Sequence, residues 1–435
     1  MHALIGNISR RVFLIFFAAL VLRLLLLTSA YHGDLNNNIS WGQIAFQEGL
    51  NGFYGSADAN DWPFSAPNQP PLTILLFAAC AWLWQVFHTF FWFLNNNIPA
   101  FPSGLIWFWE EKGMTVLVKL PSLIADMGVG ALIYKFVKEG FGRKIGELSL
   151  AIWLFNPVIW YNSAIWGQTD AIVNFFGLLA IFSLLQKNLV VFGLFYTLSI
   201  LFKGSLAIVA PVLLFVIYTQ NYPVRTIIKM ALVSLVAILA VSIWFYPHVA
   251  FPIWFYDLYK FRILPGEIGY LTANAFNFWW LVDAGSTYDN VLFAGISARM
   301  WGFLLVSVIF VYVFITLINK KFSNSYIFWA ITVVAFGAFL FMTRMHERYL
   351  YPFFVYGILL AVRSKPFLVL YSLLAICHIV NLYNLFWFPN LPSLRLFLEM
   401  GELETFLAAF NLVLFISLLK PRLFIPKDTK GQKAD

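Results

Sequence analysis

Residues 72–94 read LTILLFAACAWLWQVFHTFFWFL, and the fold depends on whether this apolar run crosses a membrane. The chain has 435 residues, of which 61% are hydrophobic and 11% are charged. Such a composition is typical of an all-α, polytopic membrane protein and not of a soluble domain. Counting residues 72–94 as a span would invert every later loop and place most lysines and arginines outside. Because basic loops favour the cytoplasmic side, we expect this run to lie within an external loop.

The other apolar runs predict a single membrane domain over residues 1–435, a bundle of about twelve transmembrane helices with both termini cytoplasmic. Arg10 and Arg11 precede the first run as in a signal peptide, but no small-residue cleavage site follows, so we expect an uncleaved first span. The predicted spans lie near residues 12–30, 114–134, 147–163, 171–186, 189–203, 205–219, 227–246, 298–318, 325–342, 350–362, 367–387 and 404–419.

Two connecting segments are longer than a helical bundle requires. Residues 31–113 form the first external loop, in which the apolar run and Leu105–Trp109 are expected to be amphipathic, interfacial or re-entrant helices. Residues 247–298 form a second external loop that is aromatic and polar together. Long ordered loops usually carry function. Residues 420–435 are predicted to form a charged cytoplasmic tail.

The distribution of charge and of cysteine excludes several classes of function. The net charge of +8 comes largely from cations that flank the predicted helices, so membrane topology explains it and no nucleic-acid partner is expected. Cys80 and Cys377 both lie in apolar runs, which argues against a disulfide framework or a thiolate metal site. The sequence contains no paired metal-ligand motif and no phosphate-binding loop, so we expect neither a metal nor a cofactor.

Asp34 follows the first predicted span within a polar stretch. A carboxylate at this membrane interface can act as a general base if an acceptor hydroxyl reaches it. Alternatively, Asp34 is a loop residue chosen because it favours a turn. Its position alone does not separate these two interpretations.

Within the bilayer, Lys119 and Asp126 lie two turns apart on one predicted helix. Charged groups at this depth are expected to be paired. We therefore expect them to pair with each other or with a residue of another helix, for which Arg23 is a candidate.

The segment Asn156–Asp170 joins two predicted spans on the external side. Asp170 begins the second helix, where a carboxylate also caps free N–H groups. Capping does not explain why Gln168 and two asparagines gather at the same membrane face, and polar residues there indicate a cavity or a partner. Lys203 interrupts another apolar run, so its ammonium group either pairs with a lipid-linked phosphate or extends to the membrane surface.

Residues 344–349 read RMHERY and give the sharpest indication of a site. Arg344, His346 and Arg348 are cationic or can become so, and they fall on the external side, where positive-inside statistics disfavour them. Guanidinium groups bind phosphate in a bidentate manner, and histidine can hydrogen-bond to a phosphate oxygen or protonate it. Glu347 either takes part in this site or neutralises one of the arginines.

These motifs, in this order, resemble the GT-C superfamily of membrane glycosyltransferases. The resemblance is closest to the dolichyl-phosphate-glucose-dependent glucosyltransferases of the N-glycan pathway and their prokaryotic relatives. That superfamily has an acidic residue just after the first span, where Asp34 stands. Residues 69–73, QPPLT, are similar to its Tyr-Pro-Pro-Leu-Thr motif, with Gln69 in place of the tyrosine.

Three later motifs extend the resemblance. Trp166–Asp170 matches the position of the second polar loop motif of the family, and Leu201–Lys203 is similar to a lysine-bearing span. His346-Glu347 is similar to a His-Glu-Lys pattern that holds the donor phosphate, with Arg348 at the position of the lysine. The resemblance implies a GT-C-like bundle with amphipathic helices in the first external loop.

The resemblance implies an inverting transfer of a hexose from a polyprenyl (dolichyl) phosphate to an acceptor hydroxyl at the extracytoplasmic face. The acceptor would be a glycan, a lipid-linked glycan or a protein. Asp34 would be the catalytic base. The implied donor-phosphate-binding residues are Lys203, Arg344, His346 and Arg348, and the implied substrate-binding residues are Gln69, Gln168, Asp170 and Glu347.

Two other classes of function compete with this interpretation. A secondary transporter or lipid-linked-sugar flippase would show inverted repeats and broken helices that meet at the bilayer midplane. An inactive scaffold subunit is the third alternative. Because the loops are short and no retention signal is visible, we expect the lipid bilayer around this protein to be a prokaryotic plasma membrane.

Overall fold

The protein is an all-α membrane protein in a computed structural model that describes residues 9–425, except residues 57, 248–249 and 265–267. The molecule is 76% helical. The end of the predicted cytoplasmic tail, residues 426–435, lies outside the described residues. The first nine helices are α1 (Arg10–Leu27), α2 (Asp34–Gln47), α3 (Pro71–Asn97), α4 (Gly104–Phe141), α5 (Arg143–Leu154), α6 (Pro157–Trp160), α7 (Asp170–Leu185), α8 (Leu189–Phe202) and α9 (Ala210–Thr219).

The second half of the chain adds shorter elements between its long helices. Its α-helices are α10 (Val224–Ser242), α11 (Phe251–Leu258), α12 (Phe278–Val282), α13 (Ala298–Asn319), α14 (Asn324–Phe341), α15 (Tyr351–Ala361), α16 (Lys365–Leu385), α17 (Pro392–Glu399), α18 (Glu402–Leu418) and α19 (Pro421–Phe424). Short helices of other types are η2 (Ala59–Asp61), η3 (Tyr161–Trp166), η4 (Gly204–Val209), η5 (Ile243–Phe245), η6 (Tyr259–Ile263) and η7 (Glu347–Leu350). The strands are β1 (Thr272–Ala273), β2 (Leu292–Phe293), β3 (Ile296–Ser297) and β4 (Met345–His346).

The number of spans differs from the predicted number. Within the described residues, six helices are long and apolar enough to cross a membrane, and the number is eight if each of two bent helix pairs counts as one span. The prediction of about twelve spans is therefore not confirmed, because α7, α8, α9 and α15 are all shorter than the roughly 20 residues that a perpendicular span needs. The bent pairs are α5 with α6 and η3, at 46°, and α17 with α18, at 77°.

One end of the bundle carries the short basic loops. There Glu147 of α5 accepts a hydrogen bond from Ser9, just before α1, at 2.8 Å and pairs with Arg143 at 2.8 Å. Arg363, just after α15, donates a hydrogen bond to Ser325 in the first turn of α14 at 2.6 Å. We call this end, where α1, α5 and α14 begin and α15 ends, the basic end.

The opposite end of the bundle joins the other ends of the same helices. Asp34, just past α1, accepts a hydrogen bond from Gln168, just before α7. Lys203, which follows α8, pairs with Asp170 at the start of α7. We call this the cavity end. An 18-residue helix such as α1 is about 27 Å long, close to the thickness of the hydrocarbon core of a bilayer.

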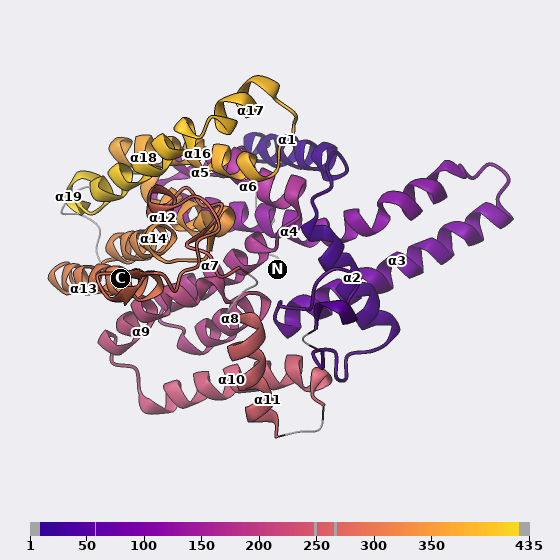
Figure 1. Cartoon of the computed structure of the whole chain (residues 1–435), viewed down its shortest axis with the longest axis horizontal. Coiled ribbons are helices and arrows are strands. Elements are labelled where there is room, and N and C mark those ends of the chain that lie inside the picture. The colour runs from indigo at the N-terminus through magenta and orange to yellow at the C-terminus, as the bar shows by residue number, and fades with distance from the viewer. Residues whose placement is uncertain (1–8, 57, 248–249, 265–267, 426–435) are drawn as a thin grey trace.

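The apolar run 72–94 forms α3, which pairs with the first half of α4 in an arm that projects from the bundle (Figure 1). The arm begins at the cavity end, where Thr73 donates a hydrogen bond to the carbonyl of Phe202. Further out, the indoles of Trp84 and Trp109 each donate to the backbone carbonyl of the other residue, at 3.2 and 3.1 Å. Although α3 is long enough to be a span, it does not connect the two ends of the bundle.

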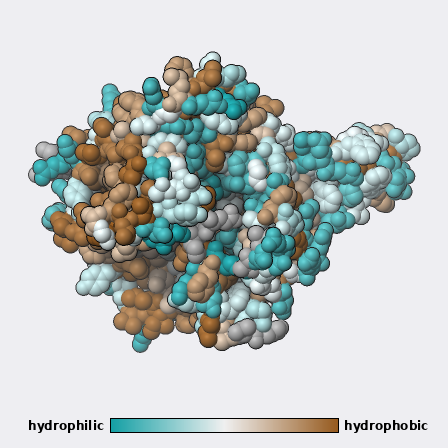
Figure 2. Space-filling view, viewed as in Figure 1, coloured by the Kyte–Doolittle hydropathy of each residue, from teal (hydrophilic) through white to brown (hydrophobic). Residues whose placement is uncertain are grey.

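Burial separates central from peripheral helices. Of the apolar 18-residue stretch in α14, 78% is buried inside the protein. In the helix that α10 forms together with η5, the corresponding share is only 11%. Hydrophobic side chains gather over α13 and near α9 and α10, while the arm is paler and more hydrophilic in the same view (Figure 2). Since a peripheral apolar helix needs an apolar solvent, the exposed surface of α10 fits contact with lipid.

The charged side chains of Arg23, Asp126 and Lys119 within the bundle all have polar partners, as is expected for charges inside a membrane protein. Arg23 of α1 pairs with Asp126 of α4 across the helix interface, with 3.4 Å between Nε and Oδ2, so the pairing is interhelical. Tyr351 also donates a hydrogen bond to Asp126, at 2.6 Å. Lys119 does not pair with Asp126; its ammonium group instead donates to three backbone carbonyls, those of Leu27, Ala30 and Ile165.

Candidate functional site

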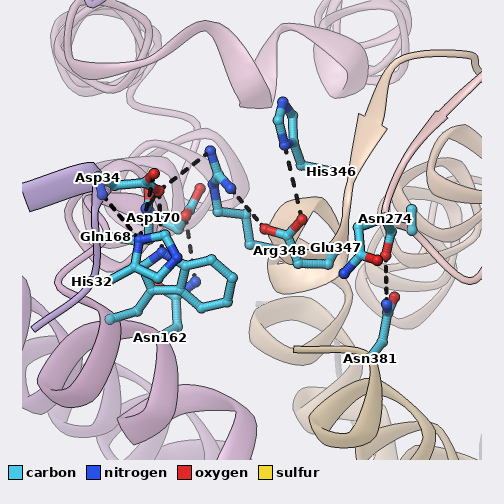
Figure 3. A network of polar contacts seen from close by, with 12 residues as sticks. His32, Asp34, Asn162, Gln168, Asp170, Asn274, His346, Glu347, Arg348 and Asn381 are labelled. Carbon is cyan, nitrogen blue, oxygen red and sulfur yellow. Dashed lines mark hydrogen bonds and ion pairs between the residues drawn. The ribbon is translucent and has the colours of Figure 1, made fainter. Parts of the chain in front are cut away.

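A cavity of about 1090 Å³ opens at the cavity end of the bundle. Polar residues from distant parts of the sequence line it, and Figure 3 shows how they approach one another. Seven of the residues singled out from the sequence line this cavity: Asp34, Gln69, Lys203, Arg344, His346, Glu347 and Arg348. The remaining two, Gln168 and Asp170, lie behind this surface and contact residues that line it.

Asp34 is the first residue of α2, and two side chains donate hydrogen bonds to one oxygen of its carboxylate. Gln168 Nε2 and Trp166 Nε1 both donate hydrogen bonds to Asp34 Oδ2, at 2.6 and 3.1 Å. Arg348 Nη2 lies 3.9 Å from the same oxygen. Burial raises the pKa of Asp34, but polar contacts, among them those with Arg348 and Trp166, lower it by more, so the pKa lies well below its usual range. Asp34 is therefore ionised at neutral pH.

Arg348 occupies the position between two carboxylates. Its Nη1 donates a hydrogen bond to Glu347 Oε1 at 2.7 Å, and its guanidinium also lies over the rings of Trp166 and Tyr349, at 5.8 and 5.7 Å. Burial lowers the pKa of Arg348, but the negative charges of Glu347 and Asp34 raise it by more, so the guanidinium stays protonated. A fixed cation thus lies next to the Asp34 carboxylate.

Lys203 lies where α8 ends and η4 begins. The helix breaks at this residue, whose backbone is extended, and the break turns the ammonium group toward the cavity end. Lys203 Nζ pairs with Asp170 Oδ1 at 2.8 Å and lies 5.2 Å from the centre of the Tyr349 ring. Asn162 of η3 donates to the other oxygen of Asp170, at 3.5 Å. Asp170 therefore orients Lys203, in addition to starting α7.

His346 belongs to β4, which pairs in parallel with β1 of the second external loop. Its Nδ1 lies 3.9 Å from Glu347 Oε2, and its ring meets that of Tyr349 edge-on at 5.0 Å. Burial lowers the pKa of His346 well below its usual value, and the charges of Arg348 and Lys203 lower it further. His346 is therefore a neutral hydrogen-bonding group at neutral pH, whereas the sequence left a cationic role open.

Arg344 is held by a carboxylate that the sequence did not single out. Asp289 accepts hydrogen bonds from Arg344 Nε at 2.8 Å and from Arg299 Nη2 at 2.7 Å. Thr343 also donates a hydrogen bond to Asp289, at 3.0 Å. Burial raises the pKa of Asp289, but these donors lower it by more, to about 2. Two guanidinium groups thus share one carboxylate, and Arg299 lines the cavity together with Arg344.

Gln69 lies just before α3, at the edge of the cavity. Its Nε2 lies 3.4 Å from Asn68 Oδ1, while its backbone carbonyl accepts a hydrogen bond from Tyr54 at 2.7 Å. The Oε1 atom of Gln69 is buried and has no hydrogen-bond partner within the described residues. An acceptor in this state is suited to a hydroxyl donor from a substrate.

Several groups at this site escaped the sequence analysis. His32 lies 3.4 Å from Asp34 Oδ1, and Asn274 of the second external loop lines the cavity and contacts Asn381 and Asn384. The one sequence signal that pointed toward Asn274 and Asp289 was the length of their loop. The cavity wall also includes apolar residues, among them Ala207, Ile208, Phe303, Ala335 and Ala338.

The arrangement supplies an ionised carboxylate, two buried cations and a neutral histidine around one cavity. Such a set can accept a proton from a hydroxyl group and stabilise an anion beside it. Within the described ranges, no three His, Cys, Asp or Glu side chains come close enough together to hold a metal ion. A scan against protein-family models finds no match to this chain, and a search of curated proteins finds no relative.

Proposed function

We propose that the protein is an inverting glycosyltransferase that moves a hexose from a polyprenyl phosphate to an acceptor hydroxyl on the external side. The observation that carries this proposal is the ion pair of Asp34 with Arg348, at 3.9 Å, in the wall of a cavity that Lys203 and His346 also line. Such a transfer needs a base for the acceptor proton and cations for the leaving phosphate, and these residues supply both.

In the proposed step, the acceptor oxygen attacks the anomeric carbon while the bond from that carbon to the phosphate oxygen breaks. The acceptor proton passes to Asp34, and the lipid phosphate leaves with the bonding electron pair. The hydrogen bonds from Trp166 and Gln168 go to Oδ2, whereas Oδ1 lies 3.4 Å from His32 Nδ1. The Asp34 side chain is 37% exposed, so an acceptor hydroxyl can reach it from the cavity. A low pKa makes Asp34 a weak base, which suits a proton that leaves late in the reaction.

The leaving phosphate gains negative charge as the sugar bond breaks. Arg348 and Lys203 already hold Glu347 and Asp170, so their positions are fixed before a substrate binds. Preorganised cations of this kind stabilise developing charge without having to reorient. Because its pKa is low, His346 contributes a hydrogen bond rather than a positive charge. The Arg299–Asp289–Arg344 group adds one net positive charge to the same cavity.

The apolar part of the cavity wall supports a lipid substrate. Ala207 and Ile208 of η4 face the cavity together with Phe303 of α13 and Ala335 and Ala338 of α14. A polyprenyl phosphate has an anionic head and an apolar tail, so a cavity with one cationic and one apolar wall suits both parts.

The decisive experiment measures transfer by the purified protein in detergent with lipid. Radiolabelled polyprenyl-phosphate hexoses serve as donors and a membrane extract as the source of acceptor. We expect transfer by the wild type and loss of transfer in Asp34→Asn, which cannot accept the proton. Glu399→Gln, which changes an exposed carboxylate of α17, is the control and keeps full activity. Failure of the wild type to transfer any hexose, or full activity of Asp34→Asn, would overturn the proposal.

The second candidate function is a secondary transporter or lipid flippase. One observation favours it: the helices break at Lys203, between α8 and η4, and the pair α5 with α6 and η3 is bent by 46°. Broken helices are a feature of transporters. In proteoliposomes, translocation of a polyprenyl-phosphate hexose without transfer, and with Asp34→Asn as active as the wild type, would favour this function over the enzyme.

A further inference from the structure

His32 lies two residues before Asp34, in the connection between α1 and α2. Its side chain is only 14% exposed. The backbone N–H of Asp34 donates a hydrogen bond to His32 Nδ1 at 3.0 Å. The residue before α2, Gly33, has no side chain to cap the helix. His32 thus satisfies the first N–H of the helix that carries the carboxylate.

The ring of His32 is held between two aromatic side chains. Its centroid lies 4.5 Å from that of Trp166, at an interplanar angle of 36°, and 4.7 Å from that of Phe386, nearly perpendicular at 89°. Trp166 Nε1 donates to Asp34 Oδ2 at 3.1 Å, so the indole that packs against His32 also holds the carboxylate. Phe386 follows α16, and its carbonyl accepts a hydrogen bond from Tyr161 at 2.5 Å.

Two contacts compete for His32 Nδ1. The nitrogen lies 3.0 Å from the Asp34 amide nitrogen and 3.4 Å from Asp34 Oδ1. It cannot accept a proton from the amide and donate one to the carboxylate at the same time. The amide contact is the shorter and lies within the ordinary range for a hydrogen bond, so the Nδ1 lone pair accepts from the amide. Arg348 and the Trp166 N–H then remain to stabilise the Asp34 anion.

We infer that His32 is a positioning residue for Asp34: its Nδ1 lone pair fixes the Asp34 backbone, and its caged ring aligns the Trp166 indole with Oδ2. This inference rests on the proposed function, because it gives His32 a part in the same reaction. The charged or titratable groups that face His32 from neighbouring elements are Asp34 itself, Arg348 beyond Trp166, and Tyr161 of η3. With Oδ2 and the backbone both held, the Asp34 carboxylate keeps one orientation.

Three substitutions separate the two contributions of His32. His32→Asn keeps an acceptor that reaches the N–H two residues on, as asparagine does in an Asx turn, but it loses the ring. His32→Phe keeps an aromatic ring in the cage but has no acceptor for the amide. His32→Ala loses both contributions. Transfer from the radiolabelled polyprenyl-phosphate hexose gives kcat and KM for each variant.

We expect His32→Phe to lose about 100-fold in kcat, the scale of a misplacement of roughly 1 Å at a reacting group, with KM for the lipid donor unchanged. His32→Asn should stay within about tenfold of the wild type, because it restores the amide contact. His32→Ala should fall at least as far as His32→Phe. Hydrogen exchange of a peptide covering residues 31–36 should be fast in His32→Phe and slow in His32→Asn, independently of any activity.

The outcomes distinguish this inference from the proposed function. If Asp34→Asn is inactive while His32→Phe matches the wild type, only the positioning role is wrong. The same conclusion follows if His32→Asn and His32→Phe lose the same activity, since the amide acceptor then makes no difference. If Asp34→Asn is fully active, the proposed function itself is wrong, and the role of His32 in that reaction is wrong with it. A rise in KM alone in His32→Phe would also overturn the inference, because it would place His32 in donor binding.

Discussion

Arg348 contacts two carboxylates at once, Glu347 at 2.7 Å and Asp34 at 3.9 Å. Under the proposed function, this cation would contact both the base and the leaving phosphate and so serve both halves of the reaction. It lowers the pKa of Asp34, whereas burial raises the pKa of the same group. At the scale of single residues, the charge state of the base therefore depends on a residue more than three hundred positions away.

Replacing Arg348 with Gln should raise the pKa of Asp34, because burial is then opposed by fewer stabilising contacts. Since the base works only when ionised, activity is lost as pH falls through its pKa, and the acidic limb of kcat/KM should move to higher pH. The measurement is kcat/KM between about pH 4 and pH 8, where the wild type should show no acidic limb from Asp34 because that pKa lies below this range, and where Arg348→Gln should show one. Arg348→Lys, which keeps the charge, should move the limb less, and Arg395→Gln in α17 should leave it in place. An unmoved limb in Arg348→Gln would contradict the prediction.

At the scale of elements, the turn between η3 and α7 carries two donors to Asp34, Trp166 and Gln168, with Gly167 between them. Gly167 has a φ of +86°, and a Cβ there would lie 2.8 Å from the Leu35 side chain and 2.9 Å from Lys119 Cγ. Gly167→Ala should therefore displace both donors and lower transfer by about 100-fold. Gly104→Ala, where a Cβ meets nothing within 4 Å, is the matched control. Equal activity of the two variants would show that the turn tolerates the change.

The interface of α1 with α4 offers a test of stability. Asp126→Leu leaves the buried Arg23 without its ion pair and should cost about 3–5 kcal/mol. The double variant Arg23→Met with Asp126→Leu removes both charges and should recover much of that loss. Thermal unfolding in detergent can be followed with a thiol-reactive dye, since both Cys80 and Cys377 are buried. A double variant no more stable than Asp126→Leu would argue against pairing as the source of the stability.

At the scale of the whole molecule, the two ends of the bundle should lie on opposite sides of the membrane. Ser286→Cys places an exposed thiol in the second external loop, and Gln186→Cys places one between α7 and α8 at the basic end. In intact cells, a membrane-impermeant maleimide should label the first and reach the second only after permeabilisation. The wild-type protein, with both thiols buried, gives the background. Labelling of both variants from the same side would contradict the topology.

The sequence could predict which polar residues gather at one end, because loop charge and apolar run length are read directly from the chain. Asp34, Lys203 and Arg348 were placed together in this way, and the structure brings them to one cavity. The predicted number of about twelve spans is not confirmed, because apolar runs that pack against protein resemble runs that face lipid. The contact of Arg344 with Asp289 joins residues 55 positions apart and depends on how the second external loop folds, which no local pattern encodes.

The parallel pairing of β1 with β4 has a consequence for motion. Thr272 pairs with Met345 and Ala273 pairs with His346. Asp289 forms ion pairs with both Arg344 and Arg299. Residues of this loop, Tyr270 and Asn274 among them, line the cavity, and these contacts join the loop to the strand that carries His346. A movement of the loop that keeps both strand pairings would carry His346 with it. Under the proposed function, entry of the lipid donor and placement of His346 would then be coupled.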